Sequence, residues 1–363
     1  MHDSLPMLQR YRTHLESTLT WLLQSERPTG GSAAYQTVFR TWSRAYPETT
    51  GYLIPTLLRA ADARSDSRLK PYAMRCGEWL LTIQNEDGSW NGRLYPPRRP
   101  RPSVFNTGQI LLGLMALWRG SREDRWLQAA ASGAAWLKDT MAPLGLWEGG
   151  DYRASRTPSY YSHALWPFLD VSQTISDDEA VERIRESYML LLGRIQEDGW
   201  IVDAGFAEGE PAFTHTIAYA IRGIQEGALL LDDFTMLSAI GPTIERIVRI
   251  AELRSGHLPG AFSAGWKPSG NFVCLTGNLQ MAESILLLES RAADLRLVSA
   301  AARLVDVVCA TQRCASASRR LGGRVAGSKP IYGPYMRLRY PNWAAKYLVD
   351  ALLALTARVE AEL

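Results

Sequence analysis

The hydrophobic positions along this chain repeat in six segments that share one design. Each segment has a polar or aromatic turn followed by an apolar stretch rich in glycine, alanine and leucine. Self-similar segments at a spacing of roughly 55–65 residues fit one helical hairpin plus a long loop per repeat. A helix that is apolar nearly all round must be buried, so these six are predicted to be inner helices. They are Thr49–Ala60, Asn106–Trp118, Tyr160–Val171, His215–Leu231, Thr276–Leu288 and Asn342–Leu355.

Six further segments alternate with the first set and are amphipathic. In Asp178–Gln196, for example, Val181, Ile184 and Tyr188 form one apolar stripe, while Arg183 falls outside it. Apolar residues at this helical spacing allow one face to pack and the other to meet water, so these are predicted to be outer helices. They are Leu8–Gln24, Lys70–Gln84, Asp124–Asp139, Asp178–Gln196, Phe234–Arg254 and Asp294–Gln312.

Strict alternation of outer and inner helices predicts two concentric rings. The fold class is therefore all-α, an (α/α)6 toroid of six outer and six inner helices, with residues 1–363 as a single domain. No run alternates with period two between turn signals, so no strand is expected. A right-handed solenoid of helix pairs is the alternative, but the count of twelve helices without distinct capping repeats favours a closed ring.

The connections predict where the working site lies. Loops from outer to inner helices are long, roughly 15–25 residues, and long loops in compact folds are usually functional. All six emerge on the face that carries the start of the inner helices. The site is therefore expected in that mouth.

Composition narrows the class of protein further. The hydrophobic and charged fractions, 46% and 21%, are typical of a globular protein, and the net charge of +3 is too small to argue for a nucleic-acid partner. Four cysteines without framework spacing predict reduced thiols. The first residues resemble no signal peptide, and no apolar run approaches the roughly 20 residues of a membrane span. We therefore expect a cytoplasmic protein, with its oligomeric state open.

Three outer helices end in related motifs. They are Gln84–Trp90 (QNEDGSW), Gln196–Trp200 (QEDGW) and a degraded version at Gln312–Gly323. The first resembles the repeat motif of the prenyltransferase and squalene-cyclase superfamily, which implies that the glutamine caps a helix end and the tryptophan packs across the next turn. Terpene cyclases of that type need an acidic DxDD box, which this chain lacks. The acidic pair Asp232–Asp233 is instead predicted to cap an outer helix.

A fuller resemblance covers essentially the whole chain. The segments that carry it are Tyr46–Pro55, Pro102–Gln109, Thr214–Tyr219, Leu275–Met281 and Tyr340–Lys346. They resemble uncharacterised toroid proteins associated with bacterial polysaccharide biosynthesis, a likeness that implies the fold but no chemistry. More distantly, the architecture is similar to (α/α)6 glycoside hydrolases and polysaccharide lyases, an analogy of fold that does not fix function.

Hydrolysis would depend on carboxylates. Glu48 lies between Tyr46 and Tyr52 at the start of an inner helix and is a candidate acid/base, although it could equally serve the helix dipole. A glycosidase needs two carboxylates across the scissile bond. The fourth long loop is acidic and offers partners for Glu48, unless it is only a solvated loop. The candidate partners are Asp203, Glu208 and Glu210.

Elimination would depend on other groups. His215 and His163 begin neighbouring inner helices and are expected to face one cavity, where histidine can shuttle protons, although a structural role is equally open for His163. A lyase needs a base for the C5 proton and a cation that neutralises the uronate. The candidates are His215 and Tyr219, with Asn106 or Asn278 and Arg337 or Arg339. Asn278 and Asn342 could also be caps or turn residues. The chain has no cluster at metal-ligand spacing, so neither metal nor other cofactor is expected.

Basic and aromatic side chains in the long loops indicate an anionic carbohydrate ligand. The second loop carries four arginines, Arg93, Arg98, Arg99 and Arg101, and the sixth, Ala315–Tyr340, carries six basic residues and no acid. Basic loops around a dipole-positive mouth attract anions, unless they serve only solubility, and aromatic rings stack on sugar faces. The predicted substrate-binding residues are Tyr46, Tyr52, Trp42, Asn106, Gln109, His163, Asn278, Gln280, Tyr335, Arg337, Tyr340, Asn342 and Trp343.

These features predict a carbohydrate-active enzyme of glycoside hydrolase type that cleaves an acidic polysaccharide or oligosaccharide. Its catalytic candidates are Glu48, His215, Tyr219, Glu208 and Glu210. One alternative is a uronate polysaccharide lyase that acts by β-elimination. A second, from a different class, is a non-catalytic glycan-binding or assembly protein of exopolysaccharide biosynthesis.

Overall fold

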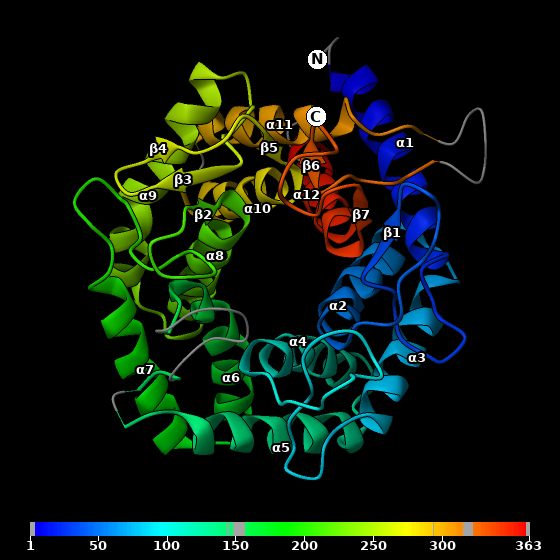
Figure 1. Cartoon of the computed structure of the whole chain (residues 1–363), viewed down its shortest axis with the longest axis vertical. Helices are drawn as coiled ribbons and strands as arrows, with labels where there is room; N and C mark the ends of the chain where they lie inside the picture. Colours follow the sequence, from blue (N-terminus) through cyan, green and yellow to red (C-terminus); the bar gives the residue numbers. More distant parts are fainter. Residues whose placement is uncertain (1–3, 144, 148–156, 293, 315–321, 361–363) are drawn as a thin grey trace.

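The chain folds into two concentric rings of helices around a central axis, as the computed structural model shows (Figure 1). The structure describes residues 4–143, 145–147, 157–292, 294–314 and 322–360. Twelve α-helices lie in this part of the chain, so the predicted (α/α)6 toroid is confirmed. The inner ring consists of α2 (Pro47–Arg64), α4 (Val104–Ser121), α6 (Ser162–Thr174), α8 (Thr214–Leu230), α10 (Leu275–Ala292) and α12 (Asn342–Glu360).

The outer ring alternates with the inner one along the sequence, as the hydrophobic pattern predicts. Its helices bury one apolar stripe, whereas α8 is buried along almost every residue of its first three turns. The outer helices are α1 (Ser4–Leu23), α3 (Leu69–Thr82), α5 (Asp124–Thr140), α7 (Asp178–Leu192), α9 (Phe234–Leu253) and α11 (Leu295–Cys309). A short 3₁₀ helix, η1 (Ser159–Tyr161), leads into α6.

Outer helices α3, α7 and α11 end two to four residues before their predicted ends at Gln84, Gln196 and Gln312. The reason is that these glutamines serve the turns after the helices. The Gln84 amide donates to the carbonyls of Gly88 at 2.9 Å and Ala129 at 3.0 Å. Trp90, the last residue of the same motif, donates from its indole to the Leu80 carbonyl at 2.8 Å. The packing implied for the tryptophan is therefore confirmed, whereas Gln84 bonds the turn and the neighbouring helix α5 and does not cap the end of α3.

The expectation of no strands was wrong. Seven strands of two or three residues lie in the long loops of the described chain, too short to produce a visible alternation in the sequence. Ala261–Ser263 and Lys267–Pro268 pair within one loop, whereas the other pairs join loops far apart in the sequence, so the register of those pairs comes from the packing of the hairpins. The strands are β1 (Tyr35–Thr37), β2 (Ala212–Phe213), β3 (Ala261–Ser263), β4 (Lys267–Pro268), β5 (Val273–Cys274), β6 (Ser328–Lys329) and β7 (Arg339–Pro341).

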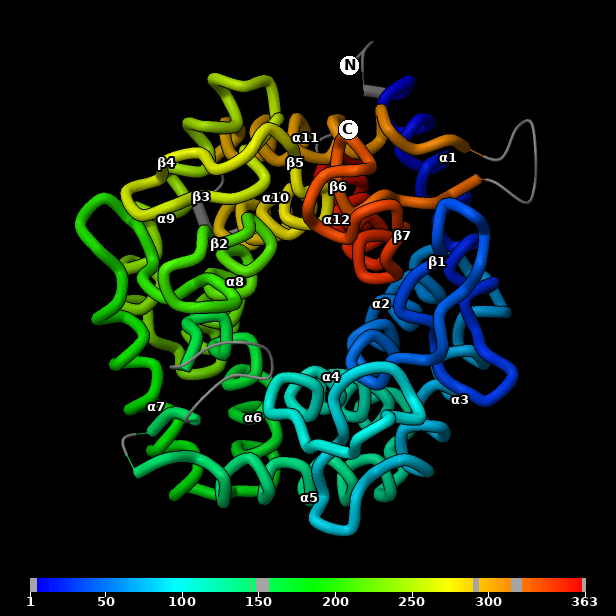
Figure 2. The backbone as a smooth tube through the Cα atoms, in the orientation of Figure 1, coloured from blue at the N-terminus to red at the C-terminus, as the bar shows by residue number. Residues whose placement is uncertain are grey.

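The first and last hairpins close the ring, which excludes an open solenoid. Figure 2 follows the chain around the toroid until the α12 segment returns to α1 and α2. Strand β1 pairs antiparallel with β7, and the backbone N–H of Asn342 donates to the Ala34 carbonyl at 2.8 Å. Arg12 on α1 forms an ion pair with Glu360 on α12 at 2.6 Å.

Several smaller expectations can also be compared with the structure. Asp233 caps α9, since its carboxylate accepts from the backbone amides of Thr235 and Met236. All four cysteines are free thiols, with Cys76, Cys274 and Cys309 buried. Among the described helices, none is long and apolar enough to cross a membrane.

Candidate active site in the mouth of the barrel

The starts of the inner helices surround a cavity of about 600 Å³. α2, α4, α8 and α12 each contribute residues from their first turns or just before them, and the loop before β7 covers one side. Inner helices point the positive ends of their dipoles here, which favours negative charge on a ligand. Of the predicted site residues, this mouth cavity brings together Tyr46, Glu48, His215, Tyr219, Tyr335, Arg337 and Trp343.

Glu48 supplies the carboxylate of the mouth. Its side chain is only 6% exposed, and the Tyr46 hydroxyl donates to its Oε2 at 2.5 Å, which fixes the orientation of the group. Among the described residues that line the cavity, Glu48 is the only acid. Burial raises the pKa of Tyr219 and Tyr335 well above the usual value, and the charge of Glu48 adds to the effect. Both phenols therefore remain protonated and face a negative charge.

His215 presents a base to the same cavity. Its Nδ1 lies 2.7 Å from Oε1 of Gln280. An amide oxygen can only accept, so Nδ1 carries the proton and Nε2 keeps its lone pair. Burial lowers the pKa of His215 to about 4, so the imidazole is neutral near pH 7. Gln280 does not line the mouth, and its role is to hold the tautomer of this histidine.

Tyr219 lies at the centre of a stack of rings. Its ring centroid is 4.4 Å from that of His215 and 4.5 Å from that of His163. Tyr347 follows at 6.4 Å and Tyr52 lies 6.3 Å beyond it. His163, Tyr347 and Tyr52 line a second cavity, at the other end of the barrel. The two predicted histidines therefore do not share one cavity, because the Tyr219 ring lies between them.

The loop from Pro334 to Arg339 forms the cationic side of the mouth. Met336 and Leu338 adopt left-handed backbone conformations, with φ of 50° and 56°, which non-glycine residues rarely adopt. Arg337, between them, is exposed and lines the cavity. The Trp343 indole donates to the Tyr335 hydroxyl at 2.8 Å and so holds the loop against α12. Backbone strain of this kind clusters at functional sites.

The acidic fourth loop does not meet Glu48. Glu208 and Glu210 are exposed and line a separate cavity of about 180 Å³ together with Asp203. The aromatic residues Phe206 and Phe213 of the same loop line the mouth instead. The predicted pairing of Glu48 with one of these acids is therefore not formed.

Several predicted substrate-binding residues are instead engaged between elements of the fold. Asn278 is fully buried and donates to the Gly256 carbonyl at 2.7 Å, and Asn342 donates to the Ser32 hydroxyl at 2.6 Å. Gln109 donates to the backbone carbonyl of His163 at 3.0 Å. These amides join neighbouring hairpins, which is the structural alternative to ligand binding. The alternative expected for Asn278 and Asn342 was a cap or a turn residue, but their side-chain amides bond carbonyl and hydroxyl groups of other elements.

The remaining predicted residues lie outside the mouth cavity. Trp42 packs on Trp21, with ring centroids 5.0 Å apart, and Arg324 lies 4.5 Å over the Tyr340 ring. Asn106 lines a neighbouring cavity that includes Tyr46. Arg319 and Arg320, two of the basic residues of the sixth loop, lie outside the described residues.

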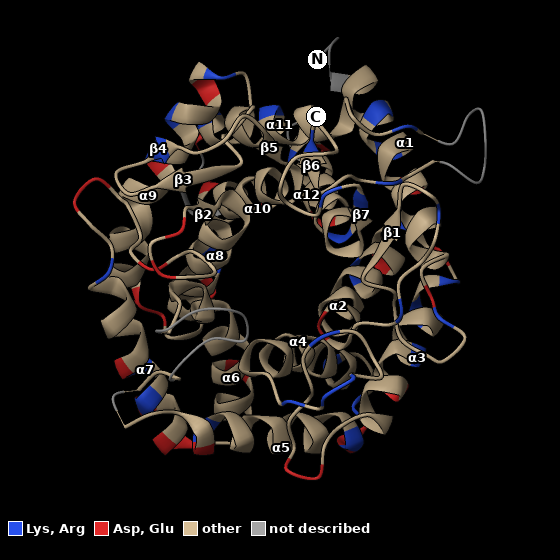
Figure 3. Cartoon of the chain, in the orientation of Figure 1, with Lys and Arg blue, Asp and Glu red and all other residues tan. Residues whose placement is uncertain are grey.

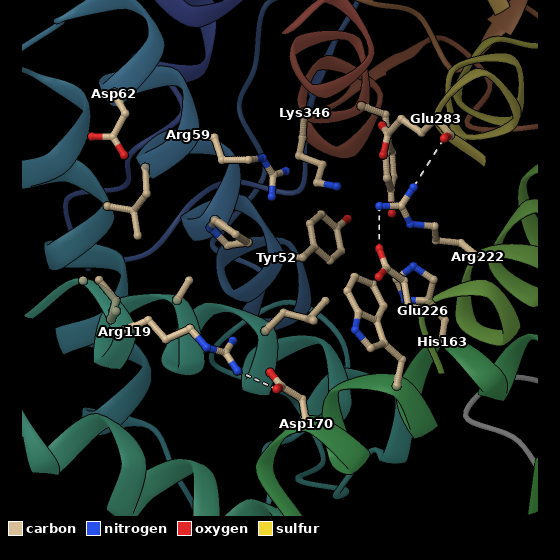
Figure 4. Close-up of a pocket in the computed structure, with 18 of the residues that line it drawn as sticks. Tyr52, Arg59, Asp62, Arg119, His163, Asp170, Arg222, Glu226, Glu283 and Lys346 are labelled. Carbon is tan, nitrogen blue, oxygen red and sulfur yellow. Dashed lines mark hydrogen bonds and ion pairs between the residues drawn. The ribbon is translucent and has the colours of Figure 1, made fainter. Parts of the chain in front are cut away.

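The far end of the barrel contains a second axial cavity, which the sequence analysis missed. Its volume is about 710 Å³, and all six inner helices contribute to its lining. Figure 4 shows Arg119 directed toward Asp170, and Arg222 toward Glu226. Burial raises the pKa of Glu283, on α10, to about 7. The available signal was charge at i and i+4 within apolar helices, at Arg222/Glu226 and Lys346/Asp350.

The charges at this end are largely satisfied by one another. The Asp350 carboxylate forms ion pairs with Arg59 at 2.6 Å and Lys346 at 2.8 Å, and it accepts a hydrogen bond from the Thr56 hydroxyl at 2.8 Å. Burial acts to raise the pKa of Asp350, but Arg59 and Lys346 outweigh it and hold that pKa well below its usual range. Lys346 also lies 3.8 Å over the Tyr347 ring. Glu48 and His215, by contrast, line the mouth cavity, which loops cover.

No group of three or more histidine, cysteine, aspartate or glutamate side chains in the described ranges could hold a metal ion.

Fold and cavity together define an (α/α)6 toroid with a mouth lined mainly by aromatic side chains, among which lie Glu48, His215, Arg337 and Arg339. No model of a known protein family matches the chain. By sequence, a stretch of 157 residues is 27% identical to a squalene–hopene cyclase of Bradyrhizobium diazoefficiens. This covers 41% of the chain but only 21% of the cyclase, so the match spans about a fifth of that relative's length.

Solved structures agree with the fold over almost the whole chain. An unsaturated glucuronyl hydrolase specific for heparin matches with a TM-score of 0.77, 15% identity and 99% coverage of both chains. A cellobiose 2-epimerase from Bacillus thermoamylovorans matches with a TM-score of 0.75, 10% identity and coverage of 96% and 99%. An unsaturated glucuronyl hydrolase from a Bacillus species, responsible for the degradation of glycosaminoglycan, matches with a TM-score of 0.73, 15% identity and coverage of 95% and 96%. At these identities the likeness establishes the architecture.

Proposed function

We propose that this protein is a hydrolase of acidic oligosaccharides that removes an unsaturated uronyl residue from the chain end, with Glu48 as its acid/base. The observation that carries the proposal is the composition of the mouth. One buried, oriented carboxylate faces tyrosines and an arginine-bearing loop in a cavity of about 600 Å³. Two solved structures of the same fold are unsaturated glucuronyl hydrolases.

A single carboxyl group suits this reaction better than ordinary glycoside hydrolysis, which uses two carboxyls on opposite faces of the sugar. The C4=C5 bond of an unsaturated uronide is part of an enol ether. A carboxylic acid can protonate C4, and the resulting carboxylate can take a proton from the water that adds at C5. The hemiketal formed then opens and releases the next sugar as an alcohol. Glu48 can act in both steps.

The other mouth residues have roles that follow from their chemistry. The uronate carboxylate would be bound by Arg337, since guanidinium binds carboxylate with two parallel hydrogen bonds. Tyr335 and Tyr219 remain protonated and can donate to sugar hydroxyls. Trp343 and Phe105 offer ring faces to the apolar side of a sugar.

The test is the release of the unsaturated sugar from glycosaminoglycan disaccharides, followed by the loss of absorbance of its double bond. Replacement of Glu48 by glutamine is expected to lower kcat by about 10²–10⁴. The matched control is Glu210→Gln, an exposed acid of the separate loop cavity, which should retain full activity. Full activity in Glu48→Gln, or equal losses in both variants, would overturn the assignment.

A second candidate is proton abstraction, as in a uronate lyase, and the state of His215 favours it. The neutral imidazole keeps its Nε2 lone pair because Gln280 holds the proton on Nδ1. A base of this kind could remove the C5 proton of a uronate while Tyr219 protonates the leaving oxygen. A lyase would lose activity on His215→Ala and retain it in Glu48→Gln.

Mass spectrometry of the products separates these reactions. Fragments that have gained one water establish hydrolysis, and new unsaturated fragments from a saturated polymer establish elimination. A product of unchanged mass but altered sugar configuration would identify an epimerase and contradict both. Binding without any product, from every acidic oligosaccharide supplied, would favour a glycan-binding role.

A further inference from the structure

Five arginines surround a cavity of about 720 Å³ beside the mouth. It is lined by the loop between α3 and α4, by the start of α4 and by Arg44 and Tyr46 before α2, and none of the described residues that line it is acidic. We refer to it as the arginine cavity. In Figure 3 the basic stretches of this loop lie across the barrel opening from the acidic loop between α7 and α8. The arginines are Arg44, Arg93, Arg98, Arg99 and Arg101.

Among the described residues, most of these cations have no counter-charge. Arg44 donates to the Pro96 carbonyl at 2.7 Å, which is a neutral acceptor. The side chains of Arg93, Arg98, Arg99 and Arg101 form no ion pair or hydrogen bond with another described residue. Elsewhere on the molecule arginines are commonly paired, as Arg296 is with Glu245 and Glu252. Four unpaired guanidinium groups around one hollow repel one another, and an anion that enters it would relieve this repulsion.

Backbone geometry adds to the positive potential. The first turn of α4 forms one wall, through Ser103 and Asn106, so a helix N-terminus also points toward the hollow. Arg93 holds a left-handed backbone conformation, with φ of 71°, which directs the loop around the cavity rather than away from it. Guanidinium forks match the geometry of tetrahedral oxyanions such as phosphoryl and sulfuryl groups.

The arginine cavity adjoins the mouth at one residue. Tyr46 lines both cavities, and its hydroxyl holds Glu48. A ligand bound to Glu48 would therefore extend past Tyr46 into the arginine cavity.

We propose that the arginine cavity is a subsite for a phosphoryl or sulfuryl group carried by the saccharide whose end lies in the mouth. This rests on the proposed function for the position of the saccharide, but not for the anion site itself. Two kinds of ligand carry such an oxyanion, a sulfated oligosaccharide and a sugar linked through diphosphate. Either would gain affinity from the arginines and lose it as salt is raised.

The test is titration calorimetry at low ionic strength with three probes: inorganic pyrophosphate, a sulfated unsaturated disaccharide and the same disaccharide without sulfate. The variant is Arg98→Gln/Arg99→Gln. Its matched control is Arg246→Gln/Arg249→Gln, which removes the same charge from the outer helix α9. Arg98, Arg99 and Arg249 are exposed and Arg246 is partly exposed, so all the substitutions should leave the fold intact.

The Arg98/Arg99 variant is expected to bind pyrophosphate and the sulfated disaccharide at least about tenfold more weakly, with the unsulfated disaccharide unaffected. Tighter binding of the sulfated disaccharide than of pyrophosphate identifies the sulfated source, and the reverse order the diphosphate source. Equal affinities in the two double variants would overturn the subsite. If pyrophosphate binding is lost as expected but no disaccharide is cleaved, the subsite stands and the proposed hydrolysis falls.

Discussion

Replacing Asp350 by asparagine should destabilise the protein more than any exposed charge substitution. The Asp350 carboxylate is 5% exposed and accepts from Arg59, Lys346 and Thr56. Arg59 is 57% exposed and can turn to water, but the Lys346 side chain is 10% exposed and cannot. The change therefore removes the ion-pair partner of a buried ammonium, for which Glu283 is the remaining carboxyl nearby. Breaking such a pair costs about 3–5 kcal/mol, and the freedom of Arg59 places this case near 3 kcal/mol.

That magnitude can be converted into a melting shift. An unfolding entropy of about 2.1 cal/mol/K per residue over the 363 residues gives about 0.76 kcal/mol/K. A loss of about 3 kcal/mol then corresponds to a decrease in Tm of about 4 °C, measurable by calorimetry at pH 7. The control is Asp62→Asn, whose ion pair with Lys70 is 69% and 61% exposed and should contribute less than about 1 kcal/mol.

Two further observations would refute the reasoning. Replacing both charges, as Lys346→Met with Asp350→Leu, should restore most of the stability because no uncompensated charge remains. The pKa of Asp350 is depressed, so its stabilisation is present above the unfolded value of about 3.9 and is lost as pH falls toward the folded value. The difference in free energy of unfolding between wild type and Asp350→Asn should therefore decrease only below about pH 4. A difference under 1 kcal/mol at pH 7, or no recovery in the double variant, would show that the pair is not coupled as described.

Three other changes test separate parts of the structure. If the reaction is the elimination with His215 as base, Gln280→Leu should lower kcat about 10–100-fold with a smaller effect on KM, because His215 loses the acceptor that holds its tautomer; an unchanged pH–rate profile would contradict this. Glu283→Gln should be more stable than wild type at pH 8 by about 2 kcal/mol and similar below pH 4.5. The reason is that Glu283 has a folded pKa of about 7, so the wild-type protein loses free energy of unfolding as pH rises above the pKa of the unfolded carboxyl. Urea unfolding at both pH values measures the difference. Asp233→Ala removes the cap of α9 and should cost about 1 kcal/mol, against Asp232→Ala as control in the same unfolding assay.

The mouth shows how far a sequence can predict a site. Glu48, His215 and Tyr219 were identified because they begin inner helices, and the starts of inner helices meet at one end of a toroid. The same rule also selected Asn278 and Asn342, which instead hold neighbouring loops. A helix start fixes which end of the barrel a residue occupies, but not whether its side chain points to the axis or to the adjacent hairpin.

The sequence did not predict which distant segments lie next to one another. Glu208 and Glu210 were expected opposite Glu48, yet their loop turns them into a separate hollow and sends Phe206 and Phe213 into the mouth. The ions of the far cavity were missed for the same reason. Only the closed ring brings Arg59 of α2 to Asp350 of α12.

The sequence by itself determined the helices, their alternation between buried and half-buried faces, and so the closed double ring. This is because helical periodicity is a local property, and each apolar surface has only a few ways to leave water. Tertiary structure alone decided that Tyr219 separates the two histidines, that β1 pairs with β7, and that Tyr46 lines both the mouth and the arginine cavity. Those contacts join residues tens to hundreds of positions apart, and their geometry depends on how the hairpins pack around the axis.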